Sequence, residues 1–211
     1  MRDFFNENGT NEYFCGEIPY KQRMISIFDD MSQMTEDEVQ RMLPLVDGLR
    51  REQALRYKHV FGQFACLKSW IMLQEMLEPL KIKDLKIAYN EHGKPYFVHH
   101  PNVHFNLSHC KNGIAVVVAS SRVGIDIESF RNSSIALVNK TMNPAEAGWI
   151  RASSDPVEVF TQFWTKKEAV VKLRGTGIVD DLHHVLDGNG YRLETHVDRE
   201  KHYAWSVAYT Q

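Results

Sequence analysis

Residues 123–128, Val-Gly-Ile-Asp-Ile-Glu, carry the pattern on which the predicted fold depends most. Their apolar and acidic side chains alternate, which is typical of a strand whose two faces meet different surroundings. Ile125 and Ile127 share one face, while Asp126 and Glu128 share the other with a glycine that leaves room for a ligand. Two carboxylates two residues apart on one face can reach a single cation. The competing interpretation is an ordinary half-buried strand with a solvated acidic face.

Strand-like and helical segments follow one another in the same order on both sides of this stretch. Further strands are predicted at residues 24–28, 85–89, 103–107, 114–119, 191–196 and 203–209. Helices are predicted at 36–43, over the long segment 49–77 with Gly62 as its weak point, from 144 onward and at 156–173. Asn143-Pro144 and Asp155-Pro156 each join a capping residue to a proline at the first helical position. We therefore predict an α+β protein of two similar, closely packed halves, residues 1–120 and 121–211.

Composition limits the classes of function. The chain has 211 residues, a formal net charge of -2 and a pI near 6.5, which argues against a general nucleic-acid binder. We see no apolar stretch near the roughly 20 residues of a membrane span, and no apolar core for a signal peptide. The three cysteines have no metal-ligand spacing and are expected to be free thiols. We expect a cytoplasmic protein that binds neither nucleic acid nor membrane.

A second acidic and basic motif lies at residues 163–172, Phe-Trp-Thr-Lys-Lys-Glu-Ala-Val-Val-Lys. Glu168 and Lys172 are four residues apart, so they share one face of the predicted helix. A carboxylate and an ammonium placed in this way can complete a metal site and hold a phosphate. A surface ion pair is the competing interpretation.

Two shorter motifs precede the acidic strand. In residues 105–109, Phe-Asn-Leu-Ser-His, the neighbours Ser108 and His109 point to opposite strand faces, so we do not expect a catalytic pair. An anion site is the better functional interpretation, and a capping serine beside a partly exposed histidine is the alternative. Lys94, in the turn Gly93-Lys94-Pro95, could touch a ligand or be an ordinary solvated lysine.

Taken in order, these four motifs resemble one family, the 4'-phosphopantetheinyl transferases. The similarity is to their single-chain form, the surfactin-synthetase-activator type, and spans about residues 49–177. The resemblance implies two α+β halves related by a pseudo-twofold, with coenzyme A in the cleft between them. It also implies a Mg²⁺ enzyme that transfers phosphopantetheine from coenzyme A to a serine of an apo acyl or peptidyl carrier protein, releasing adenosine 3',5'-bisphosphate.

The resemblance also implies a role for each matching residue. Asp126, Glu128 and Glu168 would hold Mg²⁺, whose preference for oxygen ligands they satisfy. The residues implied for coenzyme A are Lys58, Lys94, Ser108, His109 and Lys172. Lys172 would contact the pyrophosphate and support catalysis, and Glu168 is the candidate base, acting directly or through a water molecule. A monomer is expected, because one chain supplies both halves.

One departure from the family pattern concerns Gly62-Gln63, where many relatives have Asp-Arg. That arginine helps to bind a coenzyme A phosphate, and Arg56, Lys58 or Lys68 could compensate. Two other classes of function remain open: a non-catalytic protein that binds coenzyme A or another nucleotide, and a Mg²⁺-dependent phosphohydrolase or nuclease.

Overall fold

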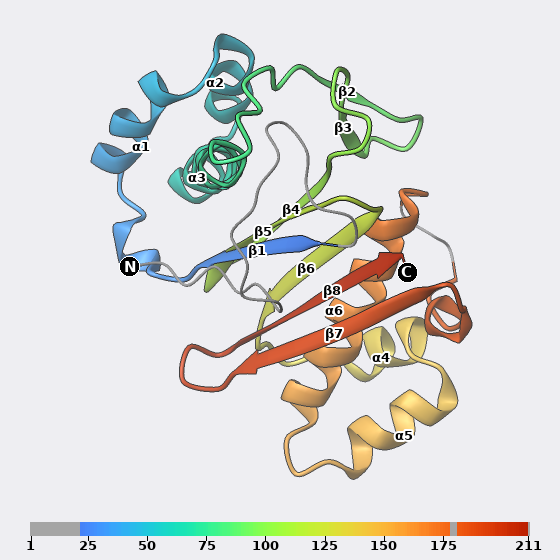
Figure 1. Ribbon diagram of the computed structural model, residues 1–211. Coiled ribbons are helices and arrows are strands. Elements are labelled where there is room, and N and C mark those ends of the chain that lie inside the picture. The colour runs from blue at the N-terminus through green and yellow to red at the C-terminus, as the bar shows by residue number, and fades with distance from the viewer. Residues whose placement is uncertain (1–21, 178–180, 211) are drawn as a thin grey trace.

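Helices and sheets alternate through the computed structural model, which describes residues 22–177 and 181–210 (Figure 1). The strands are β1 (Arg23–Phe28), β2 (Ile87–Tyr89), β3 (Pro95–Phe97), β4 (His104–Cys110), β5 (Gly113–Ala119), β6 (Val123–Ser129), β7 (Tyr191–Asp198) and β8 (Tyr203–Thr210). One antiparallel sheet has the strand order β1-β5-β4, another has the order β6-β8-β7, and β2 and β3 form a separate hairpin. The protein is therefore of mixed α+β class, as the sequence predicts.

The helices begin at the caps that the sequence contains. They are α1 (Glu36–Met42), α2 (Gly48–Leu55), α3 (Val60–Leu77), α4 (Ile135–Thr141), α5 (Pro144–Ala152) and α6 (Pro156–Arg174). Asn143 and Glu146 form a reciprocal capping box at the start of α5, and Asp155 caps α6. Gly175 ends α6 in the left-handed conformation, with φ 68°, which glycine adopts at little cost.

The prediction of one long helix over residues 49–77 is wrong. The chain leaves the helix after Leu55 and starts again at Val60, with His59 in an extended conformation as the new cap. The turn folds back onto α3, so that a Cβ at Gly62 would lie 2.6 Å from the Tyr57 ring. Helix α4 was not predicted at all, although Ser134 caps it through the amide N–H of Leu137.

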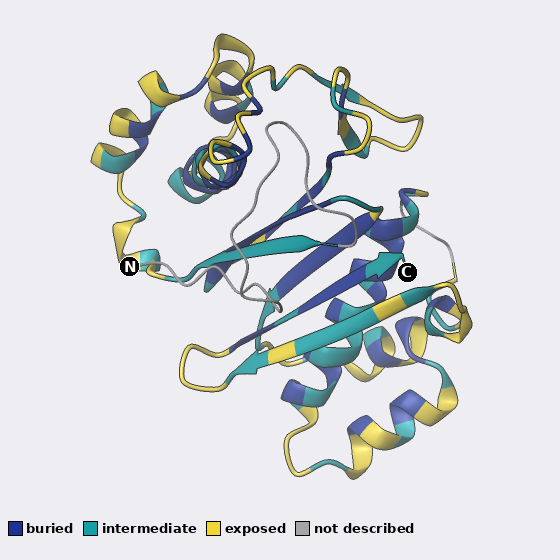
Figure 2. Ribbon diagram, viewed as in Figure 1, coloured by how far each residue is buried: buried dark blue, intermediate teal, exposed yellow. Residues whose placement is uncertain are grey.

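The two sheets pack face to face because β5 is apolar on both sides. Ile114, Val116 and Val118 contact the α3 side of the sheet, and the residues between them contact the other sheet through Ile125 and Ile127. Strands β5, β6 and β8 are accordingly buried, whereas β1 and β7 are mostly half-buried (Figure 2). Helix α6 covers the remaining face of the second sheet. The layers are thus helices, sheet, sheet, helices.

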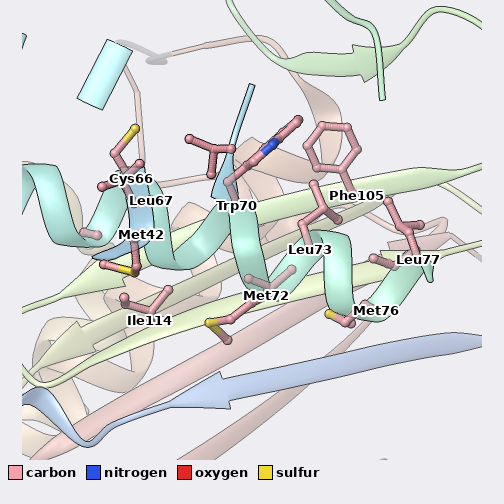
Figure 3. Packing of buried hydrophobic residues seen from close by; sticks show 14 of the residues in the cluster. Met42, Cys66, Leu67, Trp70, Met72, Leu73, Met76, Leu77, Phe105 and Ile114 are labelled. Atoms are coloured by element: carbon pink, nitrogen blue, oxygen red, sulfur yellow. The ribbon is translucent and has the colours of Figure 1, made fainter. Parts of the chain in front are cut away.

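Helix α3 is the centre of the first core. Trp70, Leu73 and Leu77 are buried along it, and Phe105 and Ile114 reach them from the sheet (Figure 3). The helix is buried on several sides because α1 and α2 cover it. This packing holds β4 and β5 in place, and these two strands carry the N-terminal side of the site described below.

Each sheet is assembled in the same way. In both, the first strand is followed by helices and then by the other two strands of the sheet, and the last strand lies in the middle: β1-β5-β4 and β6-β8-β7. The first half has the β2–β3 hairpin in addition, between α3 and β4. In residues 22–177 and 181–210, no helix is long and apolar enough to cross a membrane. Cys66 and Cys110 are free and buried, and Cys15 lies outside the described residues.

Candidate active site

A pocket of about 290 Å³ opens where the β2–β3 turn, β4 and α6 meet. Its lining residues include Lys94, Asn106, Glu168 and Lys172. The pocket therefore joins parts of the chain that are nearly eighty residues apart, from Lys94 to Lys172. It brings together three of the four sequence motifs, those at residues 93–95, 105–109 and 163–172.

Ser108, Asp126 and Lys172 form a hydrogen-bonded cluster beside this pocket. The Lys172 ammonium donates to Asp126 Oδ1 at 2.6 Å and to Ser108 Oγ at 2.9 Å, and Ser108 Oγ donates to Asp126 Oδ1 at 2.8 Å. Asp126 is only 3% exposed. Its other oxygen, Oδ2, is buried and has no hydrogen-bond partner among the described residues. A buried carboxylate oxygen without a donor is a place for a cation.

Gly124 explains how α6 comes so close to this strand. A Cβ at Gly124 would lie 2.2 Å from the carbonyl oxygen of Ala169 and 2.3 Å from the amide nitrogen of Leu173, so only glycine fits against the helix backbone. Side chains of β6 alternate, and Asp126 therefore faces α6 as Gly124 does. The contact of glycine with α6 thus places Asp126 within reach of Lys172.

Glu128 and Glu168 carry perturbed carboxyl groups near the same point. Burial raises the pKa of both groups, the charge of Asp126 raises it further, and Lys172 acts in the opposite direction. A carboxylate whose charge raises the pKa of two neighbouring carboxyl groups marks a place where a bound cation is favourable. Within the described part of the chain, no three His, Cys, Asp or Glu side chains are close enough together to form a complete metal-ligand set. The donor chemistry fits a hard cation such as Mg²⁺, with oxygen ligands supplied in part from outside the protein.

Lys94 does not point freely into the pocket. Its ammonium donates to three backbone carbonyls, at 2.8 Å to Val123, 2.6 Å to Lys172 and 3.2 Å to Leu173. Burial lowers the pKa of Lys94 to about 8, with a smaller contribution from the charge of Arg122. The turn therefore caps the end of α6 and ties the hairpin to the second sheet.

The remaining two predicted ligands lie farther from the cluster. His109 lies near the end of β4 and is exposed as a residue, but its ring packs edge-on against Phe61 and is thereby partly shielded from water. Burial lowers the pKa of His109, and the charge of Lys172 lowers it further. Lys58 is exposed in the turn between α2 and α3 and is not among the described residues that line the pocket.

Comparison with known proteins identifies the family. The model of the 4'-phosphopantetheinyl transferase superfamily matches residues 122–210. The chain is 32% identical over 177 residues to the 4'-phosphopantetheinyl transferase AcpT of Escherichia coli O157:H7, which covers 80% of this chain and 78% of that protein. The chain belongs to the 4'-phosphopantetheinyl transferase superfamily.

Other 4'-phosphopantetheinyl transferases match in the same way. One from Bacillus subtilis is 28% identical over 153 residues, which is 69% of this chain and 67% of that protein. Another, Sfp of Bacillus subtilis strain 168, is 23% identical over 150 residues, with the same shares. The resemblance inferred from the motifs is thereby confirmed, and the chain is an enzyme of the transferase class with phosphopantetheinyl transferase activity.

The sequence predicted no role for two polar residues of this transferase, one in the pocket and one in a buried ion pair. Asn106 lines the pocket, and its side-chain oxygen accepts a 2.9 Å hydrogen bond from the amide of Ile125. Lys167, to which no role was assigned, is fully buried and pairs with Glu146 at 2.7 Å. The signal for Asn106 was its position two residues before Ser108, which puts both side chains on one face of β4. No local signal indicates the partner of Lys167.

Proposed function

We propose that the pocket binds coenzyme A and that Asp126, Glu128 and Glu168 hold Mg²⁺ beside it. The observation that carries this proposal is the unpartnered, buried Oδ2 atom of Asp126 at the edge of a cluster with Lys172. The raised pKa values of Glu128 and Glu168 support it, because a divalent cation offsets the repulsion among the three carboxylates. Mg²⁺ would neutralise charge that develops on phosphoryl oxygens.

The residues of the chain have separate tasks in the proposed transfer. The hydroxyl oxygen of a carrier-protein serine forms a bond to the phosphorus that bears the pantetheine arm, and the phosphoanhydride bond to adenosine 3',5'-bisphosphate breaks. Lys172 stabilises the negative charge on the phosphoryl group. Glu168, whose pKa is raised mainly by burial, accepts the serine proton.

Ser108 and His109 are proposed to bind the phosphates of coenzyme A, together with Lys58 and Lys94. Ser108 already donates to Asp126 and lies next to Lys172, so it is well placed for this task. The Lys94 ammonium is engaged with backbone carbonyls, and its contribution to binding is therefore the position of the turn around the pocket. Lys58 reaches a ligand only if that ligand extends beyond the pocket lining.

The proposed architecture is two halves, residues 1–120 and 121–211, related by a pseudo-twofold. The identical strand order of the two sheets supports this relation. The proposed acceptor is an apo acyl or peptidyl carrier protein, and the enzyme is proposed to act as a cytoplasmic monomer. A single chain provides both sides of the pocket, which supports the monomer.

Mass spectrometry of a purified apo acyl carrier protein tests the proposal. With coenzyme A, Mg²⁺ and the enzyme, the carrier is expected to gain one phosphopantetheine on its serine. Asp126→Ala is expected to abolish the gain, whereas Asp37→Ala, which removes an exposed carboxylate from α1, is the matched control and retains it.

Four outcomes would contradict the proposal. Binding of coenzyme A with no transfer to any of several acyl and peptidyl carriers would favour the non-catalytic binding protein. Release of adenosine 3',5'-bisphosphate without a carrier would favour a hydrolase. Full activity of Asp126→Ala, or transfer that is independent of Mg²⁺, would refute the metal assignment.

A further inference from the structure

Strand β6 lies at the edge of its sheet, and its outward backbone groups meet side chains of the N-terminal half. In an antiparallel strand, the N–H and C=O groups of alternate residues point to opposite edges. Residues 124, 126 and 128 direct these groups toward β8, and residues 123, 125, 127 and 129 direct them away from it. An edge of this kind usually pairs with another strand or is covered.

Side chains take the place of a pairing strand along this edge. Lys94 donates to the Val123 carbonyl at 2.8 Å, and Asn106 Oδ1 accepts from the Ile125 amide at 2.9 Å. Ser108 Oγ accepts from the Ile127 amide at 3.3 Å. At the far end, the Ser129 hydroxyl donates to Asn112 Oδ1 at 2.9 Å and accepts from the Asn112 amide. We name these four residues, Lys94, Asn106, Ser108 and Asn112, the edge ladder.

Asn106 is the residue of the edge ladder that binds β6 directly beside Asp126. It is buried, and the group that it holds is the amide of Ile125, the residue directly before Asp126. A backbone N–H can only donate, so the atom of Asn106 that faces it is the amide oxygen. Asn106 also lines the pocket.

We propose that Asn106 is a positioning residue for phosphopantetheinyl transfer: it fixes the register of β6 against β4 and so holds Asp126 at the pocket. This inference rests on the proposed role of Asp126. Asn106 acts on Asp126 through the backbone of β6. The effect of losing Asn106 on the rate therefore depends on how far Asp126 is displaced. A misplacement of about 1 Å costs roughly 10²-fold in rate when groups are otherwise aligned.

Two alanine variants of the edge ladder provide a matched comparison. Asn106→Ala removes the step beside Asp126, and Asn112→Ala removes the step at the far end of β6, where Asn112 also donates to the Lys201 carbonyl. Both variants lose hydrogen bonds between the same two halves of the protein. Only Asn106→Ala removes a bond to the backbone of β6, because Asn112 bonds the Ser129 hydroxyl, so only Asn106→Ala is expected to move Asp126.

The experiment measures amide hydrogen exchange at Ile125 by NMR in the free protein, and kcat and KM for coenzyme A at saturating Mg²⁺. Asn106→Ala is expected to accelerate Ile125 exchange at least about tenfold and to lower kcat about 10- to 100-fold. Asn112→Ala is expected to keep kcat within about twofold of the wild type. If Asn106→Ala does not fold, Asn106→Thr, which is closer in volume, is measured by the same criteria.

Three results would overturn the inference. They are an unchanged kcat in Asn106→Ala, an equal loss of kcat in both alanine variants, and a loss of kcat without faster exchange at Ile125, which would indicate direct contact with a ligand. Asp126→Ala in the same assay distinguishes failure of the positioning role of Asn106 from failure of the proposed function. If Asp126→Ala is inactive while Asn106→Ala is fully active, only the positioning role fails; if Asp126→Ala is active, the proposed function fails with it.

Discussion

The buried ion pair between Lys167 and Glu146 gives the sharpest prediction about stability. The Lys167 side chain is 0% exposed and that of Glu146 is 4% exposed, with 2.7 Å between Nζ and Oε2. Lys167 also donates to the Leu182 carbonyl at 2.8 Å, and Glu146 Oε2 also accepts from the Asn143 amide at 2.8 Å. The pair therefore joins α5, α6 and the segment that follows α6.

Removing one partner leaves the other charge buried. In Lys167→Met, the Glu146 carboxylate keeps only its bond from the Asn143 amide, and in Glu146→Gln the Lys167 ammonium faces only neutral oxygens. Loss of one member of a buried pair costs about 3–5 kcal/mol in the free energy of unfolding. The double variant Lys167→Met/Glu146→Gln removes both charges, and it is expected to lie within about 2 kcal/mol of the wild type, because neither charge is then left buried without its partner.

Urea unfolding followed by circular dichroism measures these free energies at pH 7. Lys111→Met, an exposed lysine in the β4–β5 turn, is the matched control and is expected to change the free energy by no more than about 0.5 kcal/mol. A single variant that costs less than about 1 kcal/mol would refute the reasoning, since the remaining charge would then be hydrated. Additive losses in the double variant would refute it as well, because a true pair is strongly non-additive.

Further predictions follow from the same contacts. Gly124→Ala places a Cβ 2.2 Å from the Ala169 carbonyl, and we expect it to lower the free energy of unfolding by about 1–3 kcal/mol or more and to lower transfer activity, as measured by urea unfolding and carrier mass spectrometry. Lys94→Met leaves three carbonyls without their shared donor and is expected to cost about 1–3 kcal/mol in the same unfolding assay. The folded-state pKa of Glu168 is raised, so its contribution to stability is present below its unfolded pKa and is lost as pH rises through the folded value. In EDTA, the Tm of the wild type should therefore fall relative to that of Glu168→Gln as pH rises above the ordinary glutamate pKa, and parallel Tm curves would contradict the shift.

The elements whose signals are local could be predicted from the sequence. Alternation located β6, and a capping residue followed by proline located the starts of α5 and α6. The sequence indicated a weak point at Gly62 but not the break between α2 and α3 just before it, because the break depends on the packing of Tyr57 over Gly62, which no periodicity contains. A prediction from local pattern extends a helix wherever helix formers continue.

In the site too, features set by spacing within one helix could be predicted, whereas contacts between distant parts of the chain could not. The spacing of Glu168 and Lys172 on one helix face could be predicted, and the pocket lining includes both residues. The sequence could not show that the Lys94 ammonium would be engaged by carbonyls of β6 and α6, nor that Lys167 would pair with Glu146. These partners are 21 or more residues away, and only the tertiary structure brings them together.

Strand β6 contributes both to the contact between the two halves and to the site, because its side chains and its backbone groups point in different directions. Its even-numbered side chains, including Asp126, face α6, while its odd-numbered backbone groups face the edge ladder of the other half. A substitution at Ser108 therefore removes a neighbour of Lys172 and a support of the strand at once. The loss of activity in such a variant cannot by itself assign a ligand contact. Asn106 also lines the pocket, so a loss of kcat in its variants indicates a positioning role only when exchange at Ile125 is accelerated as well, whereas variants of Ser108 change the Lys172 contact and the strand support together.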